Sequence, residues 1–357
     1  MNEVVTPTKP APAATAAVGQ TKSIDPTKAQ VRVVNEPPPF FIKPLLTDRR
    51  YIKILAYGIH GSGKTSLLAS AVDVAGMRDV LMVNCESGTL SIETAEHIVE
   101  RELIDQVPCT TFKMVAHVKD FLKAHCIARE ANDILTLKAL QARMWGYKRS
   151  IIDEECTEDE FDINDEGERV YTRVRLRRYR TVIVDSLSEV NAYLIYQLLG
   201  ITEETSLDDD KVEETAGWDE YKKGNQMLQM LIRAYRDLPM NVLMACGTQY
   251  NQDENKVMHW GPSLIGKLAS QVQGFFDIVG FMKVGKPPEG KPTEIPRTLW
   301  IQPVERFAAK TRLAQFKDPY INKPTMTKLM SIFRDKKTTL FKAKPAPAGQ
   351  PTQTAAS

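Results

Sequence analysis

One glycine-rich segment, "YGIHGSGKTSLL" at 57–68, limits the folds open to this 357-residue chain more than any other. Its spacing is Gly58-x-x-x-x-Gly63-Lys64-Thr65, the pattern of a phosphate-binding loop. The apolar run "YIKILAYG" before it predicts a β-strand, and "KTSLLASAVDVAG" after it predicts a helix. A strand, a glycine-rich turn and a helix in this order are the context that the pattern requires, so we expect an α/β fold.

The residues of this loop suit the binding of phosphate groups. Glycine lacks a Cβ atom, so its backbone can approach a phosphate closely and turn N–H groups towards it. We expect Lys64 to contact the β- and γ-phosphates of ATP and the Thr65 hydroxyl to bind Mg²⁺. The helix that follows adds a favourable potential for anions. The predicted nucleotide-binding residues are Gly58, His60, Gly61, Ser62, Gly63, Lys64, Thr65 and Ser66.

Further apolar runs alternate with helical patterns along the chain. They lie at 79–86, 181–186 and 241–249, and each has a continuously apolar centre, as is typical of strands covered on both faces. We therefore predict a mainly parallel sheet flanked by helices. Nearer the C-terminus, the runs 275–284 and 297–312 flank a Pro- and Gly-rich turn and predict an antiparallel hairpin added to this core.

Composition sets the limits of the folded part. Residues 1–38 and 342–357 are rich in Pro, Ala and Thr and are predicted to be disordered tails, which leaves one domain at 39–341. Within it, 118–145 has helical spacing. The segment 146–179 is first acidic and then basic, and we interpret it as an insertion that is partly loop, with room for one hairpin.

Charge and cysteine content exclude some classes of protein. The formal net charge of +2 is too small for the whole surface to attract nucleic acid, so any such contact depends on local patches. The five cysteines are scattered and include no Cys-x-x-Cys pair, which argues against structural zinc. The chain has no run of 18 apolar residues and no signal peptide, so we expect a cytoplasmic protein without a membrane span.

A carboxylate ends the apolar run at 181–186. Asp185 follows three apolar residues, the arrangement in which a P-loop protein holds Mg²⁺ through water. The alternative is that Asp185 caps the helix that begins near Ser186. We favour the metal role, because a phosphate loop needs such an acid.

The base that activates water is expected elsewhere, because Ser186 and no second acid follows Asp185. Glu86 ends the run 79–86, at the carboxyl edge where ligands bind in parallel sheets. We expect this strand to lie beside the phosphate loop. A carboxylate there can orient a water molecule and take its proton.

In combination, the phosphate loop, Glu86 in "ESG", Asp185 before a serine and Gln249 in "GTQ" resemble the RecA superfamily. The resemblance implies a RecA-like core that hydrolyses ATP. It also implies that Gln249 senses the γ-phosphate and transmits its presence to a DNA-binding loop at 250–264.

The segment "FAAKTRLAQF" resembles the Lys-x-Arg segment of RecA- and DnaB-type assemblies. This implies that Lys310 and Arg312 reach the nucleotide of a neighbouring subunit, in a homo-oligomer with shared active sites. A solvated pair of cations is the alternative. Over 51–333, apart from the insertion, the order of motifs is similar to a group of bacteriophage RecA-like ATPases that includes single-strand annealing recombinases. That implies a phage-encoded protein acting on single-stranded DNA in the host cytoplasm.

The region 250–264 has side chains of its own that suit nucleic acid. Tyr250, Lys256, His259 and Trp260 combine aromatic rings for base stacking with cations for phosphates. Two acids at 253–254 oppose phosphate binding, so composition leaves the question open.

A second basic segment, "RVYTRVRLRRYR", places Arg173, Arg175 and Arg177 on one face of a strand. These arginines either follow a DNA backbone or pair with the neighbouring acidic run at 153–168, and we favour the pairing. The acidic run is not a calcium loop, because Arg173 stands at the twelfth position of "DINDEGERVYTR", where a bidentate Glu is needed.

Three hypotheses follow. The first is an oligomeric RecA-like ATPase acting on single-stranded DNA in recombination, annealing or replication. The second is a helicase-like or loader motor with the same core. The third is a small-molecule kinase, which would need an acceptor pocket and a lid carrying an arginine.

Overall fold

The computed structural model describes residues 51–86, 88–144, 151–202, 204–206, 215–252, 256, 258–291, 295–304 and 306–334. The chain falls into two units, Met1–Arg49 and Arg50–Ser357, and all described residues belong to the second. The predicted tails at 1–38 and 342–357, and both ends of the predicted domain, lie outside the described residues.

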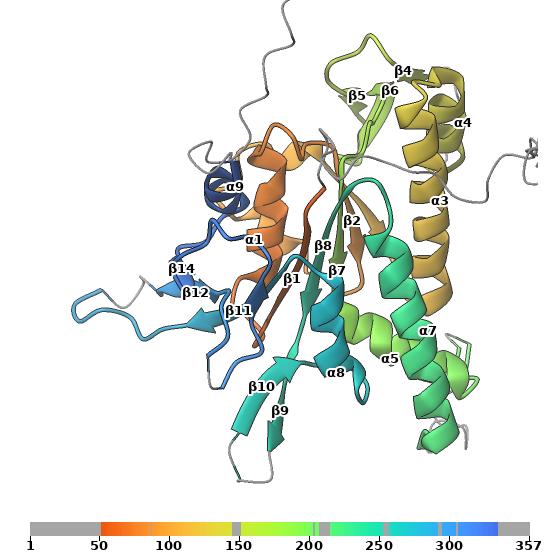
Figure 1. Ribbon diagram of the computed structural model, residues 1–357. Coiled ribbons are helices and arrows are strands. Elements are labelled where there is room, and N and C mark those ends of the chain that lie inside the picture. Colours follow the sequence, from red (N-terminus) through yellow and green to blue (C-terminus); the bar gives the residue numbers. More distant parts are fainter. Residues whose placement is uncertain are drawn as a thin grey trace, which may run out of the picture. The chain divides into compact units, whose positions relative to one another are not determined.

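A nine-stranded sheet forms the centre of the fold (Figure 1). Its strands are β1 (Lys53–Gly58), β2 (Val80–Asn84), β3 (Ile104–Pro108), β7 (Thr181–Asp185), β8 (Asn241–Cys246), β11 (Ile278–Val284), β12 (Arg297–Trp300), β13 (Lys310–Thr311) and β14 (Tyr320–Asn322). Their order is β14-β12-β11-β1-β8-β7-β2-β3, and β13 also pairs with β11. The six strands from β11 to β3 run parallel, which confirms the predicted α/β class.

The C-terminal strands reverse this direction. β12 pairs antiparallel with β11, β14 with β12, and β13 with β11. The predicted antiparallel hairpin at the C-terminal side of the core is therefore confirmed, and it is extended by two short strands.

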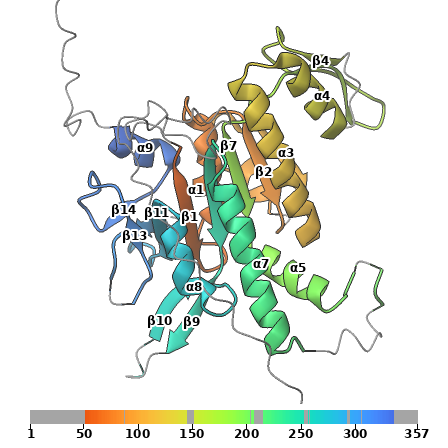
Figure 2. The ribbon, with the colours of Figure 1, turned by 45° about the vertical axis from the view of Figure 1, so that its right-hand side comes forward.

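Helices cover both faces of the sheet (Figures 1 and 2). They are α1 (Lys64–Ala69), α2 (Leu90–Glu93), α3 (Phe112–Glu130), α4 (Ile134–Met144), α5 (Leu187–Leu198), α7 (Trp218–Arg236), α8 (Leu268–Gln271) and α9 (Met326–Arg334), with short 3₁₀ turns at Ser70–Asp73, Arg101–Leu103 and Val272–Phe275. The helical pattern predicted at 118–145 is two helices, since the chain turns at Asn132 with φ of 53°. Among the described residues, no helix is long and apolar enough to span a bilayer.

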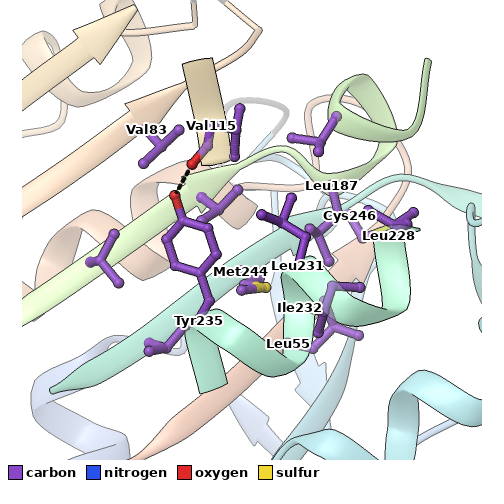
Figure 3. Close-up of a cluster of buried hydrophobic side chains, with 14 of the residues drawn as sticks. Leu55, Val83, Val115, Leu187, Leu228, Leu231, Ile232, Tyr235, Met244 and Cys246 are labelled. Carbon is purple, nitrogen blue, oxygen red and sulfur yellow. Dashed lines mark hydrogen bonds between the residues drawn. The ribbon is translucent and has the colours of Figure 1, made fainter. Parts of the chain in front are cut away.

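Alternate residues of each strand serve different hydrophobic clusters. Leu55 and Tyr57 of β1 face a cluster with α3, α5 and α7, whereas Ile54 and Ala56 face a second cluster with α1 and α9. Figure 3 shows the first cluster, where the buried Tyr235 hydroxyl of α7 donates a hydrogen bond of 2.7 Å to the Val115 carbonyl of α3. Burial on both faces explains the continuous apolar runs of the sequence.

Two strand predictions need correction. The run at 241–249 is not one strand: β8 ends at Cys246, and β9 (Thr248–Gln252) begins a separate antiparallel pair with β10 (Met258–Pro262). The strand at 79–86 is not beside the strand of the phosphate loop, because β8 and β7 lie between β1 and β2. Strand order depends on long-range pairing, which local periodicity does not encode.

The insertion contains a small sheet of its own. β5 (Glu160–Ile163) and β6 (Arg169–Arg175) form an antiparallel hairpin, and β4 (Ile152–Asp153) pairs parallel with β6. Its arginines make ion pairs within the chain: Arg173 with Asp153 and Glu160, Arg175 with Asp79, and Arg177 with Asp105 and Asp159. The favoured interpretation, pairing with the acidic run at 153–168, is confirmed for Arg173 and Arg177, whereas Arg175 forms its ion pair with Asp79, outside that run.

Arg177 joins the insertion to the edge of the central sheet. Its side chain is only 3% exposed, and its guanidinium lies 2.7 Å from Asp105 of β3 and 2.5 Å from Asp159 of the insertion. Burial alone would lower the pKa of Arg177, but the hydrogen bonds that it donates to both carboxylates raise this pKa above its ordinary value. The charge is buried but fully paired.

We expect Arg177→Met to lower the free energy of unfolding by about 3 to 5 kcal/mol, because it leaves two largely buried carboxylates without their cation. Urea denaturation followed by circular dichroism measures this change. Arg173→Met is the matched control: this arginine is 42% exposed, and its loss should have a much smaller effect. Equal destabilisation by the two substitutions would contradict the importance of the buried arginine.

Candidate nucleotide-binding site

The phosphate loop connects β1 to α1, as predicted. Gly61 and Gly63 adopt positive φ angles of 73° and 91°, which glycine tolerates and other residues rarely adopt. Gly58 is required for a different reason: a Cβ atom there would lie 2.7 Å from the Met282 carbonyl oxygen of β11. The structure therefore explains why glycine is needed at each of these three positions.

Lys64 and Ser62 lie inside this loop. The buried Lys64 ammonium donates hydrogen bonds to the carbonyls of Gly58 at 3.3 Å and Ile59 at 3.1 Å, which holds it across the loop. The Ser62 hydroxyl is buried without a hydrogen-bond partner among the described residues. A bound phosphate group would supply acceptors for these two donors, so the residues fit a nucleotide.

Thr65 and Asp185 bring the loop and β7 together. The Thr65 hydroxyl donates a hydrogen bond of 2.6 Å to Asp185 Oδ2, while Asp185 Oδ1 is buried without a hydrogen-bond partner in the described part. Burial raises the pKa of Asp185 to about 6, and the nearby Glu86 charge contributes in the same direction, against the Thr65 hydrogen bond and the Lys64 charge. A bound cation would favour the ionised form, so this pair fits Mg²⁺ held partly through water.

The alternative role of Asp185 as a helix cap is wrong. The residue before α5 is Ser186, joined to Asp185 by a cis peptide bond, and the Asp185 carboxylate is directed to Thr65. No group of three His, Cys, Asp or Glu side chains suited to a metal occurs among the described residues. A metal here would therefore take most of its ligands from water and phosphate.

Glu86 reaches the site through its neighbour. β2 pairs with β7, so Glu86 follows the strand end beside Asp185, and the Ser186 hydroxyl donates a hydrogen bond to Glu86 Oε1. The expected position at the carboxyl edge holds, although the neighbouring strand is β7 and not β1. Lys64, Thr65, Asp185 and Glu86 are thus brought together by three parallel strands and one helix start.

Gln249 lies in β9, beyond the end of β8. Its side-chain amide donates to the Leu264 carbonyl at 3.4 Å, and none of its hydrogen bonds is to Lys64, Asp185 or Glu86. The link between β8 and β9 is Gly247, whose N–H donates a hydrogen bond of 2.8 Å to Ser188 Oγ of α5.

The predicted DNA-binding loop at 250–264 is mainly a strand pair, β9–β10, and its residues 253–255 and 257 lie outside the described part. Tyr250 and Trp260 face each other across the pair with ring centroids 4.1 Å apart. Trp260 also packs against Phe281 of the core, whereas Tyr250 is 54% exposed. Lys256 is exposed and His259 is half-buried.

Lys310 and Arg312 lie away from the phosphate loop of their own chain. Lys310 pairs with Val279 of β11, three residues before the partner of Gly58, which is about 10 Å along the strand. The Lys310 ammonium donates to the Gln273 carbonyl at 2.8 Å, and Arg312 donates to the Gly274 carbonyl at 2.6 Å. Both cations are held by backbone carbonyls, and burial lowers the pKa of Lys310.

One cation beside the loop has no counterpart among the predicted site residues. Arg297, the first residue of β12, lies against Gly63 at the wall of a cavity of about 570 Å³. It follows a Pro- and Gly-rich turn in the sequence, and no motif marks it. Only the pairing of β12 with β11 brings it to the loop.

Comparisons with known proteins identify the family of this chain. The model of one protein family, described as an AAA domain (AAA_24), matches residues 50–313. No curated protein sequence matches the chain. Among solved structures, the crystal structure of the RadB recombinase is similar, with 12% sequence identity, a TM-score of 0.32, and coverage of 76% of this chain and 84% of that chain. Because the family match extends over well more than half of the sequence and contains the whole phosphate loop, the chain belongs to the AAA-domain family of P-loop nucleoside triphosphatases.

Proposed function

We propose that this protein is a RecA-like ATPase that assembles into a homo-oligomer with shared active sites and acts on single-stranded DNA in recombination, annealing or replication. The observation that carries the ATPase part is a constellation at one edge of the sheet, in which Thr65 is hydrogen-bonded to Asp185 and the adjacent Ser186 is hydrogen-bonded to Glu86. A phage origin and action in the host cytoplasm belong to this proposal.

Each residue of the constellation has a role in hydrolysis. Lys64 and the N–H groups of the loop bind the phosphates, and Thr65 and Asp185 hold Mg²⁺. The bound ion supplies positive charge opposite the phosphate oxygens. Glu86 orients the attacking water and accepts its proton, and Ser186 keeps the Glu86 carboxylate in place. Gln249 is proposed as the residue that responds to the γ-phosphate.

Lys310 and Arg312 are proposed to complete the site of a neighbouring subunit. Their distance along the sheet from their own phosphate loop supports this role. Their bonds to the carbonyls of residues 273 and 274 fix the two side chains together. Cations that approach a transferred phosphoryl group stabilise its developing charge.

The proposed contact with DNA involves the β9–β10 pair. Tyr250 and Lys256 are exposed there, and His259 and Trp260 lie on the opposite strand. An exposed tyrosine can stack on a base of any sequence, and a lysine can contact phosphate. The same pair is attached through Gly247 to Ser188, three residues after Asp185, which supports coupling between nucleotide and DNA.

We expect Glu86→Gln to bind ATP normally but to lower the turnover number by about 10²- to 10⁴-fold, because the amide cannot accept the proton. Nucleotide affinity is measured by titration with a fluorescent ATP analogue, and turnover by phosphate release. Glu96→Gln, an exposed glutamate elsewhere on the surface, is the control. Unchanged turnover in Glu86→Gln would contradict the assigned base, whereas normal turnover in Lys64→Ala would contradict the whole site.

Shared active sites predict recovery of activity in mixtures. Arg312→Ala and Lys64→Ala subunits should each be nearly inactive alone, but a mixture should regain part of the ATPase rate, since some sites then combine an intact loop with an intact arginine. A mixture of Lys64→Ala with Glu86→Gln is the control, because both substitutions damage the same side of the site. No recovery in the first mixture would argue against the action of Arg312 on a neighbour.

The DNA role predicts an ATPase rate that rises with single-stranded DNA. Tyr250→Ala should weaken DNA binding roughly 5- to 100-fold through lost stacking, and leave the DNA-free rate unchanged. Tyr196→Ala, a similarly exposed tyrosine on α5, is the matched control. A rate indifferent to DNA and raised by a small metabolite would support a kinase instead. Strand separation driven by ATP would support the helicase-like alternative.

A further inference from the structure

The cavity beside the phosphate loop has a cationic wall and apolar walls. Gly63 and Ser66 border it on the side of the loop, and Pro296, Arg297 and Lys323 border it on the side of the C-terminal strands. Its described lining contains no Asp or Glu. A volume of about 570 Å³ is within the range of pockets that hold small ligands.

Arg297 is held at this place by the backbone on both sides. Its main chain pairs with Val284 of β11, and its carbonyl accepts a hydrogen bond of 2.9 Å from the Lys323 N–H. The side chain extends to the loop: a Cβ atom on Gly63 would lie 3.0 Å from Arg297 Cδ and 3.1 Å from Nε. The aliphatic part of Arg297 therefore packs directly on the last glycine of the loop.

The charge of Arg297 is not used within the described part of the chain. Its guanidinium makes no hydrogen bond or ion pair there, whereas Arg173, Arg175, Arg177 and Arg312 all have carboxylate partners. An arginine fork fits the oxygens of a phosphate group by two parallel hydrogen bonds. Its position beside the loop leaves the phosphates of a bound nucleotide as the nearest suitable anion.

We propose that Arg297 binds the nucleotide of its own subunit, by contacting the phosphates nearest the sugar, while the adjoining cavity takes the nucleoside. This inference rests on the proposed nucleotide site and adds a residue to it. Arg297 lies against the phosphate loop that contains Lys64. Lys310, in contrast, pairs with β11 at Val279, away from that loop, and Arg312 follows it closely in the sequence. Its contribution is to affinity for both ADP and ATP, because both contain those phosphates.

The test is binding of ADP to the full chain, without DNA and without turnover, by calorimetry in the presence of Mg²⁺. Arg297→Ala should weaken ADP binding about 10- to 100-fold, as expected for the loss of charge-assisted hydrogen bonds. Arg297→Lys should be intermediate, since it keeps the charge and loses the fork. Arg306→Ala, an exposed arginine of the same region, should bind ADP like the unaltered protein.

The outcomes separate this inference from the proposed function. If the unaltered protein binds ADP and Arg297→Ala binds it equally well with an unchanged melting temperature, the role of Arg297 is overturned and the ATPase proposal stands. If the unaltered protein binds no nucleotide, both are overturned. Mixtures test the subunit at ATP concentrations too low to fill the Arg297→Ala site. A mixture of Arg297→Ala with Lys64→Ala should not regain activity there, because both residues serve one loop. Recovery would place Arg297 at a neighbour's site and overturn the proposal.

Discussion

The hydrogen bond between Thr65 and Asp185 is the contact on which the geometry of the site depends. It joins the first turn of α1 to the end of β7, across the intervening strand β8. Asp185 is almost fully buried, and the Lys64 side chain beside it is buried as well, so both groups depend on polar partners inside the protein. Through Ser186, the same strand end fixes Glu86. The phosphate loop, Asp185 and Glu86 are thereby held by one chain of polar contacts within an apolar sheet.

The sequence allowed the α/β class and most of this constellation to be predicted, because short local patterns in the sequence mark them. Glycine spacing at 58–63 reflects backbone angles and one close approach, and Asp185 and Glu86 each end an apolar run. The place of β2 in the sheet was not predictable in the same way. Its pairing with β7 follows from packing between distant segments, which places β8 and β7 between β2 and the strand of the phosphate loop.

Residues whose positions depend on contacts between distant segments were the hardest to predict from the sequence. Arg297 reaches Gly63 because β12 pairs antiparallel with β11, and no sequence motif predicts this pairing. The break of the fourth apolar run at Gly247 was also missed, since residues 248 and 249 extend its strand-like pattern. Trp260, expected to contact nucleic acid, is partly used in packing against Phe281. Hydrophobic periodicity identifies helices and strands well. It does not tell which side chains outside those patterns will pack against the core.

The attachment of the β9–β10 pair has a mechanical consequence. Gly247 fixes the base of the pair to Ser188 at the start of α5, and antiparallel hydrogen bonds make the two strands one stiff unit. A strand of five residues is about 17 Å long. A rotation of about 10° at Gly247 would therefore carry the far end of β9 through about 3 Å, a displacement as large as a hydrogen-bond length. A small rearrangement at Ser188, three residues after Asp185, would thus be amplified along β9, and most strongly at its far end, Gln252.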